Sequence, residues 1–327
     1  MRRPIIIALV IFVTIIVLAL LYTLFTQQGA TKVQNLDFNL VEESGFDNVQ
    51  ITPNGLLASR KNNIYRYNES NKQFDQIGSV KIGDVGISND GKFISSGNNK
   101  ETIIYDINIK QTKVLASDFF GWVGSGSNYV FTQPKPSTPG TDVIPDIKES
   151  ILLGNPQNNT ITKIASTNMP FRVIASSDTQ ILLACGLDIS TIVNRIDVAS
   201  KTVTQVESVI NPSYIRTSSP SLAASTNQST TSSKVYLLSS DGKKTDTGIG
   251  VLLSNLFVDT DQSMLVAATT TKLTQVSKYP SGQQNSTLLY QINYVVPSLK
   301  SFVKYNNTLI FNSTQGVVVA QIAENSK

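Results

Sequence analysis

A short strand-turn-strand unit recurs along this chain and restricts the possible fold more than any other feature. In each copy an apolar run leads into a polar turn and a second apolar run, as in Val85-Gly-Ile-Ser-Asn-Asp-Gly-Lys-Phe-Ile. The spacing of roughly 35 to 50 residues is that of four-stranded propeller blades. The copies begin at Val49, Val85, Trp122, Val173, Tyr214, Leu256 and Phe302, the copy at Tyr214 being the weakest. The repeat predicts about seven structural units.

Most copies continue into a third strand, a polar turn and a fourth strand. Residues 103–115 and 193–206 show this second hairpin, with β-branched side chains on both sides of an Asn- or Asp-containing turn. Such turns tolerate the left-handed backbone that tight hairpins need, and β-branched residues suit strands. No helical period persists after residue 27. We therefore predict an all-β fold, a β-propeller of seven four-stranded blades, preceded by one transmembrane helix.

One blade carries a family resemblance. The run Ile87-Ser-Asn-Asp-Gly-Lys-Phe-Ile-Ser-Ser-Gly, followed by Ile104-Tyr-Asp-Ile, resembles a blade of WD-repeat-like and periplasmic Tol-type propellers. The resemblance implies the fold and covers the other blades by period only. The Gly-His and Trp-Asp pairs of true WD repeats are absent, so it implies neither their hydrogen-bond network nor a function.

The last copy ends after its third strand, and the chain itself offers a substitute for the fourth. Many propellers close the ring with a strand from the other end of the chain, because an open inner edge invites aggregation. We expect the segment from Val33 to Leu40 to pair with the last blade as its outermost strand. Alternation places Leu36, Phe38 and Leu40 on one apolar face.

The N-terminus predicts a membrane anchor. Residues 5–25 carry no charge, and at about 1.5 Å per residue such a helix spans a bilayer core. Arg2 and Arg3 precede it, so the positive-inside rule predicts a single-pass protein with its N-terminus in the cytoplasm and the rest at the cell surface or in the periplasm. The predicted parts are a cytoplasmic tail 1–3, an anchor 4–26, a linker 27–32 and an extracytoplasmic propeller 33–327. A cleaved signal peptide, the alternative, has a shorter apolar core.

Composition removes several classes of chemistry. The chain has no histidine and one cysteine, Cys185, so catalysis by Ser-His-Asp or Cys-His and zinc bound by histidine are excluded, as is an intrachain disulfide. Cys185 lies in an apolar run and is expected to be a buried thiol. Two of the 27 basic residues, Arg2 and Arg3, precede the apolar N-terminal segment. The rest of the chain has 25 basic and 23 acidic residues, a net charge of +2, so we predict no nucleic-acid partner. We also predict no cofactor and no metal site.

Candidate partner-binding residues lie in and before one long insertion. In a four-stranded blade the loops between the second and third strands share a face with the interblade connections. One such loop, residues 134–149, is rich in proline, which reduces the entropy lost on binding. Aromatic side chains, enriched at interfaces, precede it, although packing at the strand interface of the third blade is the favoured explanation of them. The candidates are Phe119, Phe120, Trp122, Pro134, Lys135, Pro136, Asp142 and Asp146.

These observations favour a membrane-anchored binding or scaffolding propeller that recruits a protein, peptide or glycan through the loop face. A carboxylate-dependent propeller hydrolase is the first alternative, because glycosidases need only paired Asp or Glu. An envelope assembly or sensor component is the second. Two close carboxylates in a central pocket would favour the hydrolase. Because the sequence shows no catalytic constellation, we expect a binding protein rather than an enzyme.

Overall fold

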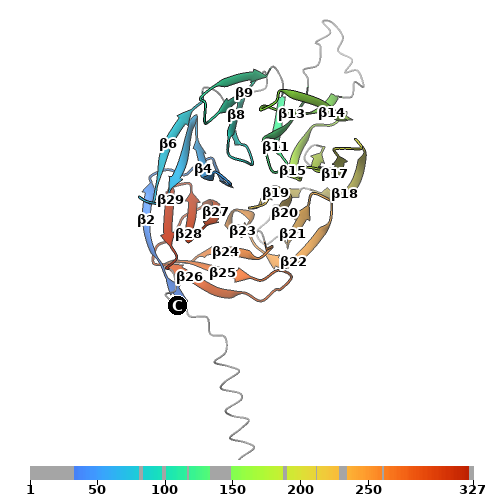
Figure 1. Cartoon of the computed structure of the whole chain (residues 1–327). Coiled ribbons are helices and arrows are strands. Elements are labelled where there is room, and N and C mark those ends of the chain that lie inside the picture. Colours follow the sequence, from blue (N-terminus) through green and yellow to red (C-terminus); the bar gives the residue numbers. More distant parts are fainter. Residues whose placement is uncertain are drawn as a thin grey trace, which may run out of the picture.

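The chain is a seven-bladed β-propeller. The structure, a computed structural model, describes residues 33–80, 84–97, 101–115, 118–132, 149–186, 190–210, 212–227, 234–259 and 261–323. Seven sheets follow one another along the chain and surround a common centre, and Figure 1 shows the closed ring. The seven predicted recurrences coincide with the first two strands of the seven blades.

Each blade is an antiparallel meander whose first strand is innermost. Blade 1 contains β3 (Asn48–Thr52), β4 (Gly55–Arg60), β5 (Asn63–Asn68) and β6 (Gln73–Ser79). Blade 2 contains β7 (Asp84–Ile87), β8 (Phe93–Gly97), β9 (Thr102–Asp106) and β10 (Thr112–Leu115). Blade 3 contains β11 (Asp118–Val123), β12 (Asn128–Thr132), β13 (Glu149–Asn155) and β14 (Thr160–Thr167). Blade 4 contains β15 (Phe171–Ser176), β16 (Gln180–Cys185), β17 (Ser190–Asp197) and β18 (Val203–Ile210).

The last three blades include the elements that close the ring. Blade 5 contains β19 (Pro212–Arg216), β20 (Leu222–Asn227), β21 (Lys234–Ser239) and β22 (Lys244–Gly250). A short 3-10 helix, η1 (Leu253–Asn255), leads into blade 6, which contains β23 (Leu256–Val258), β24 (Met264–Thr269), β25 (Thr274–Tyr279) and β26 (Thr287–Ile292). Blade 7 contains β27 (Leu299–Tyr305), β28 (Thr308–Ser313), β29 (Gly316–Gln321) and, from the start of the domain, β2 (Asp37–Glu42).

The predicted ring closure is confirmed for the part of the segment that forms β2. This strand pairs antiparallel with β29 and is the outermost strand of the last blade, and Figure 1 shows β2 beside β29. In addition, β1 (Gln34–Asn35) pairs parallel with β26 of blade 6, which the sequence did not indicate. The chain therefore joins blades 6 and 7 at their outer edge before it enters blade 1.

The expected apolar face of this segment is only partly correct. Leu36 is buried and Phe38 packs against Tyr294, with 5.2 Å between ring centroids, but Leu40 is 52% exposed. The pairing with β29 shifts register between Leu40 and Glu42, and Val41 packs against the core instead. The extra residue at this shift interrupts the alternation directly after Leu40.

Burial decreases from the second strand of a blade to the outer strand. All six residues of β28 are buried, whereas most of the outer strand β14 is exposed. Strands covered by neighbouring blades on both faces favour continuous apolar runs, and strands at the rim do not. Cys185 is 2% exposed in β16, and burial raises the pKa of its thiol, as expected for a structural residue.

The predicted anchor, residues 4–26, lies outside the described residues. Among the residues that the structure does describe, no helix is both long and apolar enough to cross a membrane.

Candidate functional site

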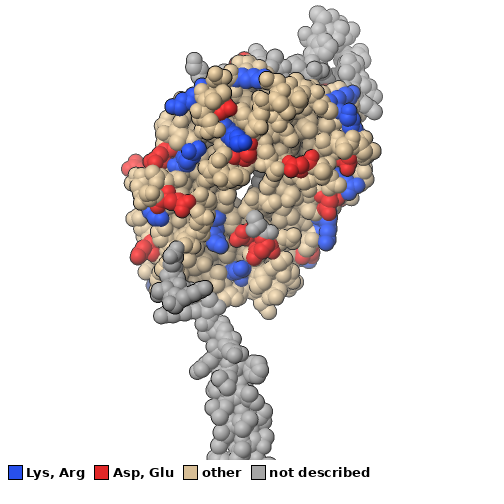
Figure 2. All heavy atoms as spheres, in the orientation of Figure 1, with Lys and Arg blue, Asp and Glu red and all other residues tan. Residues whose placement is uncertain are grey.

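The centre of the ring holds a cavity of about 680 Å³. Inner strands of blades 1, 5, 6 and 7 form much of its wall, and Figure 2 shows the ring opening at its middle. The volume falls within the range of small-ligand sites. Apolar side chains supply much of the lining, namely Val49, Ile51, Ile215, Leu253, Leu256, Phe257, Val258, Phe302 and Val303. We refer to this cavity as the channel.

Several polar side chains of the channel wall are already hydrogen-bonded within the protein. Gln50 Nε2 donates to the carbonyl oxygen of Ser88 at 3.4 Å and to Asn89 Oδ1 at 3.3 Å. Ser218 Oγ donates to the carbonyl oxygen of Val258 at 2.7 Å. Each bond joins two neighbouring blades. Because these groups are satisfied internally, apolar surface carries more of the wall's capacity to bind a ligand.

The two mouths of the channel can be told apart by the direction of the inner strands. All inner strands run in the same direction, so their first residues lie at one end, the connection mouth, and their last residues at the other, the hairpin mouth. Asp47 and Lys300 lie at the connection mouth, with Lys300 Nζ 3.6 Å from Asp47 Oδ1 and side chains 39% and 58% exposed for the lysine and the aspartate. They are the only charged residues among those that line the described channel.

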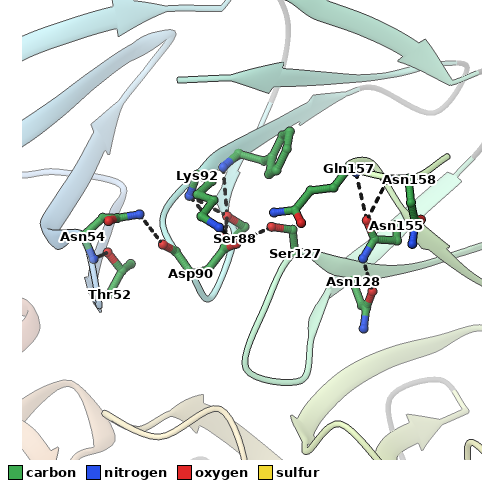
Figure 3. Close-up of polar contacts among 11 residues, drawn as sticks. Thr52, Asn54, Ser88, Asp90, Lys92, Ser127, Asn128, Asn155, Gln157 and Asn158 are labelled. Carbon is green, nitrogen blue, oxygen red and sulfur yellow. Dashed lines mark hydrogen bonds and ion pairs between the residues drawn. The ribbon is translucent and has the colours of Figure 1, made fainter. Parts of the chain in front are cut away.

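The hairpin mouth is held by bonds between the turns of adjacent blades. Asp90, in the Ser-Asn-Asp-Gly turn of blade 2, accepts a hydrogen bond from Ser127 of blade 3 through Oδ2. Its backbone carbonyl accepts from Asn54 Nδ2 of blade 1 at 2.8 Å. Ser88 Oγ in turn binds Asp90 Oδ1 and accepts the N–H of Lys92 and of Phe93 (Figure 3). The motif behind the family resemblance therefore ties three blades together.

The candidate aromatic residues pack inside the ring. Trp122 is 1% exposed and its Nε1 donates to Ser95 Oγ at 3.1 Å. Phe119 packs against Trp122. Phe120 stacks on Phe171 of blade 4, with 4.1 Å between ring centroids. Trp122 thus has almost no surface to offer a partner, and none of the three aromatic candidates lines the channel. They join blade 3 to its neighbours.

The other five candidates, Pro134, Lys135, Pro136, Asp142 and Asp146, lie outside the described residues. The flanking strands β12 and β13 end and begin at the face of the interblade connections, as expected. Among described residues, no three His, Cys, Asp or Glu side chains gather in a way that could hold a metal ion. The channel residues carried no motif in the sequence, because they come from blades far apart along the chain.

Comparisons with known proteins support the fold. No family model matches the chain, and no curated protein matches its sequence. Solved structures do match. An oligogalacturonate lyase from Vibrio parahaemolyticus is 13% identical with a TM-score of 0.56, and the match covers 91% of this chain and 100% of the lyase. A further oligogalacturonate lyase, solved with manganese, is 11% identical with a TM-score of 0.55, over 90% of this chain and 99% of the other.

A prolyl endopeptidase also matches, at 10% identity and a TM-score of 0.51, over 88% of this chain and 51% of the endopeptidase. Likeness at such identities shows the propeller fold alone, because unrelated functions occur on this architecture.

Proposed function

We propose that this protein is a membrane-anchored, extracytoplasmic binding propeller that recruits a protein or peptide partner through its central channel. The observation that carries the proposal is the channel itself, whose largely apolar wall has one ion pair at one mouth. Burial of apolar surface is the main favourable term in most protein associations, and a rigid ring loses little entropy when it binds.

The arrangement of acidic residues favours binding over the hydrolase alternative. Hydrolysis by two carboxylates needs a pair roughly 5 to 9.5 Å apart. Asp47 is the only acid that lines the described channel, and it faces Lys300 rather than a second carboxylate. Figure 2 shows basic side chains beside the acidic ones around the ring opening on the face in view. A neutral site suits recruitment more than acid-base chemistry.

The proposed anchor would hold the ring by its rim. The described chain begins at the outer edge, where β1 pairs with β26 and β2 with β29. Seven residues separate position 26 from Gln34, and an extended chain of that length reaches at most about 25 Å. A tether at the edge, rather than at the centre, keeps it clear of the channel. A partner could then enter while the ring stays close to the membrane.

Partner capture tests the channel. The full chain, purified in detergent and immobilised, is incubated with an envelope extract from its own host, and retained proteins are identified by mass spectrometry. Ser254 of η1 lines the channel and is half-buried, so Ser254→Trp should obstruct it. Thr162→Trp, on the exposed outer strand β14, is the matched control. A partner retained by wild type and Thr162→Trp but lost with Ser254→Trp supports the proposal. Equal retention by both variants, or no specific retention, refutes it.

Cysteine labelling tests the location. Cys185 is buried, so the folded wild type gives little background with an impermeant maleimide. Lys163→Cys places a thiol on the exposed strand β14. Reaction of this variant in intact cells is the expected result. Protection until the cells are lysed would contradict an extracytoplasmic propeller.

A further inference from the structure

The connection mouth has the chemistry to recognise one end of a peptide. Resting on the proposed binding function, we propose that the channel takes the carboxy-terminal end of a partner chain. In this arrangement the α-carboxylate binds Lys300 and the last, aliphatic side chains enter the cavity. Three features of the described residues carry the inference: the free bonding capacity of Lys300, the amide of Asn48 and the apolar wall.

Lys300 retains capacity for an anion. Among the described residues its ammonium group has only long contacts, 3.4 Å to the carbonyl oxygen of Phe46 and 3.6 Å to Asp47 Oδ1. Charge-assisted bonds to a carboxylate are normally about 2.7 to 2.9 Å. Asp47 is better occupied, because its Oδ2 accepts the backbone N–H of Lys61 at 2.7 Å. Of the two charged groups at the mouth, the cation therefore has more to gain from a ligand of opposite charge.

Asn48 supplies a group for the peptide backbone. It lines the channel next to Asp47, and its side-chain amide has no hydrogen-bond partner among the described residues. An amide offers two donor hydrogens and an acceptor oxygen, which match the N–H and C=O groups of an extended peptide. A fatty acid also has a carboxylate and an aliphatic body, but it has no backbone groups for Asn48. A peptide uses all three features.

The wall favours aliphatic side chains over sugars. Its two aromatic residues, Phe257 and Phe302, are 7% and 2% exposed, so neither presents a ring face to the lumen on which a sugar could stack. Val49, Ile51 and Leu253 offer branched apolar surface instead. Burying each aliphatic side chain of a ligand against such surface is favourable, and the cavity of about 680 Å³ has room for several.

Fluorescence anisotropy with the full chain in detergent micelles tests the proposal. The probe is a fluorescein-Gly-Ser pool that ends in two residues chosen from Val, Leu and Ile, prepared with a free α-carboxylate and as the carboxamide. Empty micelles measure partition into detergent. We expect the acid to bind saturably and the carboxamide about tenfold more weakly, since a hydrogen bond to a charged group is lost.

Lys300→Met should weaken binding of the acid to the level of the carboxamide without changing the carboxamide. Lys300→Arg should retain most of the acid's affinity. Lys163→Met, on the exposed outer strand β14, should change neither. Thermal unfolding of each variant shows whether it is folded, so a loss of binding by Lys300→Met with an unchanged melting temperature is attributable to the mouth.

Several results would overturn the inference. Equal affinity of acid and carboxamide, or wild-type binding by Lys300→Met, would show that Lys300 does not recognise a carboxylate. Saturable binding of a fluorescein-labelled decanoate, with no binding of the peptide pool, would assign the site to a fatty acid. If no peptide binds while partner capture still depends on Ser254, this inference fails and the proposed function stands. Peptide binding without such capture would instead support a carboxylate site and contradict recruitment of a protein partner.

Discussion

Asn312 binds both backbone polar groups of Phe46. Its Oδ1 accepts the Phe46 N–H at 2.7 Å, and its Nδ2 donates to the Phe46 carbonyl oxygen at 3.1 Å. Phe46 is fully buried and Asn312 is 1% exposed, so water cannot replace either bond. Phe46 lies in the connection from blade 7 to blade 1, and Asn312 lies in β28. One side chain thus fixes the passage from the last blade into the first.

Asn312→Ala should lower the free energy of unfolding by about 2 to 4 kcal/mol, because it leaves the buried Phe46 N–H without a partner and the Phe46 carbonyl oxygen with only the long contact from Lys300. Urea denaturation of the full chain in detergent, followed by tryptophan fluorescence, measures the change. Asn285→Ala is the control, since Asn285 is exposed and should shift stability by less than about 0.5 kcal/mol. Similar stabilities for the two variants would show that the bonds to Phe46 contribute little.

Gly45 permits the close packing beside this connection. A Cβ at Gly45 would overlap the backbone carbonyl oxygen of Ser313, so the backbone would have to move. Gly45→Ala should therefore separate blades 7 and 1 and strongly reduce the yield of folded protein. Gly126→Ala provides the comparison, because a Cβ at Gly126 has nothing within 4 Å. Size-exclusion chromatography and thermal unfolding distinguish them, and wild-type behaviour of Gly45→Ala would mean that the connection adjusts readily.

Two leucines of the closing segment should differ in their effect on stability. Leu36 is 6% exposed, so Leu36→Ala should destabilise the ring by about 2 to 4 kcal/mol through lost burial and a cavity. Leu40 is 52% exposed, so Leu40→Ala should change stability by less than about 0.5 kcal/mol. Chemical denaturation checks both. Equal losses would indicate that the whole segment packs as the simple alternation predicted.

Tyr214 should make the fold sensitive to alkali. Burial, together with the nearby negative charge of Glu207 and against the opposing effect of Arg172, raises the pKa of Tyr214 to about 12. The unfolded chain ionises this tyrosine near pH 10. Its contribution to stability is therefore complete below pH 10 and is lost as the pH rises from 10 to 12.

Between pH 9 and 12 the wild type should lose about 2 kcal/mol more than Tyr214→Phe, after allowance for the partial exposure of the side chain. Denaturation at both pH values measures this difference, and absorbance at 295 nm follows ionisation. If the two proteins show the same dependence on pH, the hydroxyl of Tyr214 is already solvated in the folded state.

Periodicity was sufficient to predict the blades. Turns such as Ser88-Asn-Asp-Gly lie between apolar runs, and this local chemistry specifies a hairpin whatever the neighbouring blades do. The same period left the last blade without a fourth strand, and this gap indicated the pairing of β2 with β29. The short parallel contact of β1 with β26 left no comparable signal, because only two residues form it.

The candidate site could not be predicted in this way. Asp47 and Lys300 meet at one mouth although 253 positions separate them, and no spacing rule links residues brought together by ring closure. Trp122 illustrates the reverse difficulty: an aromatic residue suits a binding surface and a core equally, and only its bond to Ser95 and its burial show which role it has. Local patterns report on hairpins, whereas a channel depends on how all the blades pack together.

The pairing of β2 with β29 also has a consequence for biosynthesis. Asp37 pairs with Gln321, so the outermost strand of the last blade is among the first parts of the domain to leave the ribosome, and its partner is among the last. Until synthesis reaches β29, the early strand has no sheet to join and its edge stays open to other chains. A nascent chain that stalls within blade 7 is therefore a substrate for chaperones or proteases, and the ring is completed only after β29 has left the ribosome.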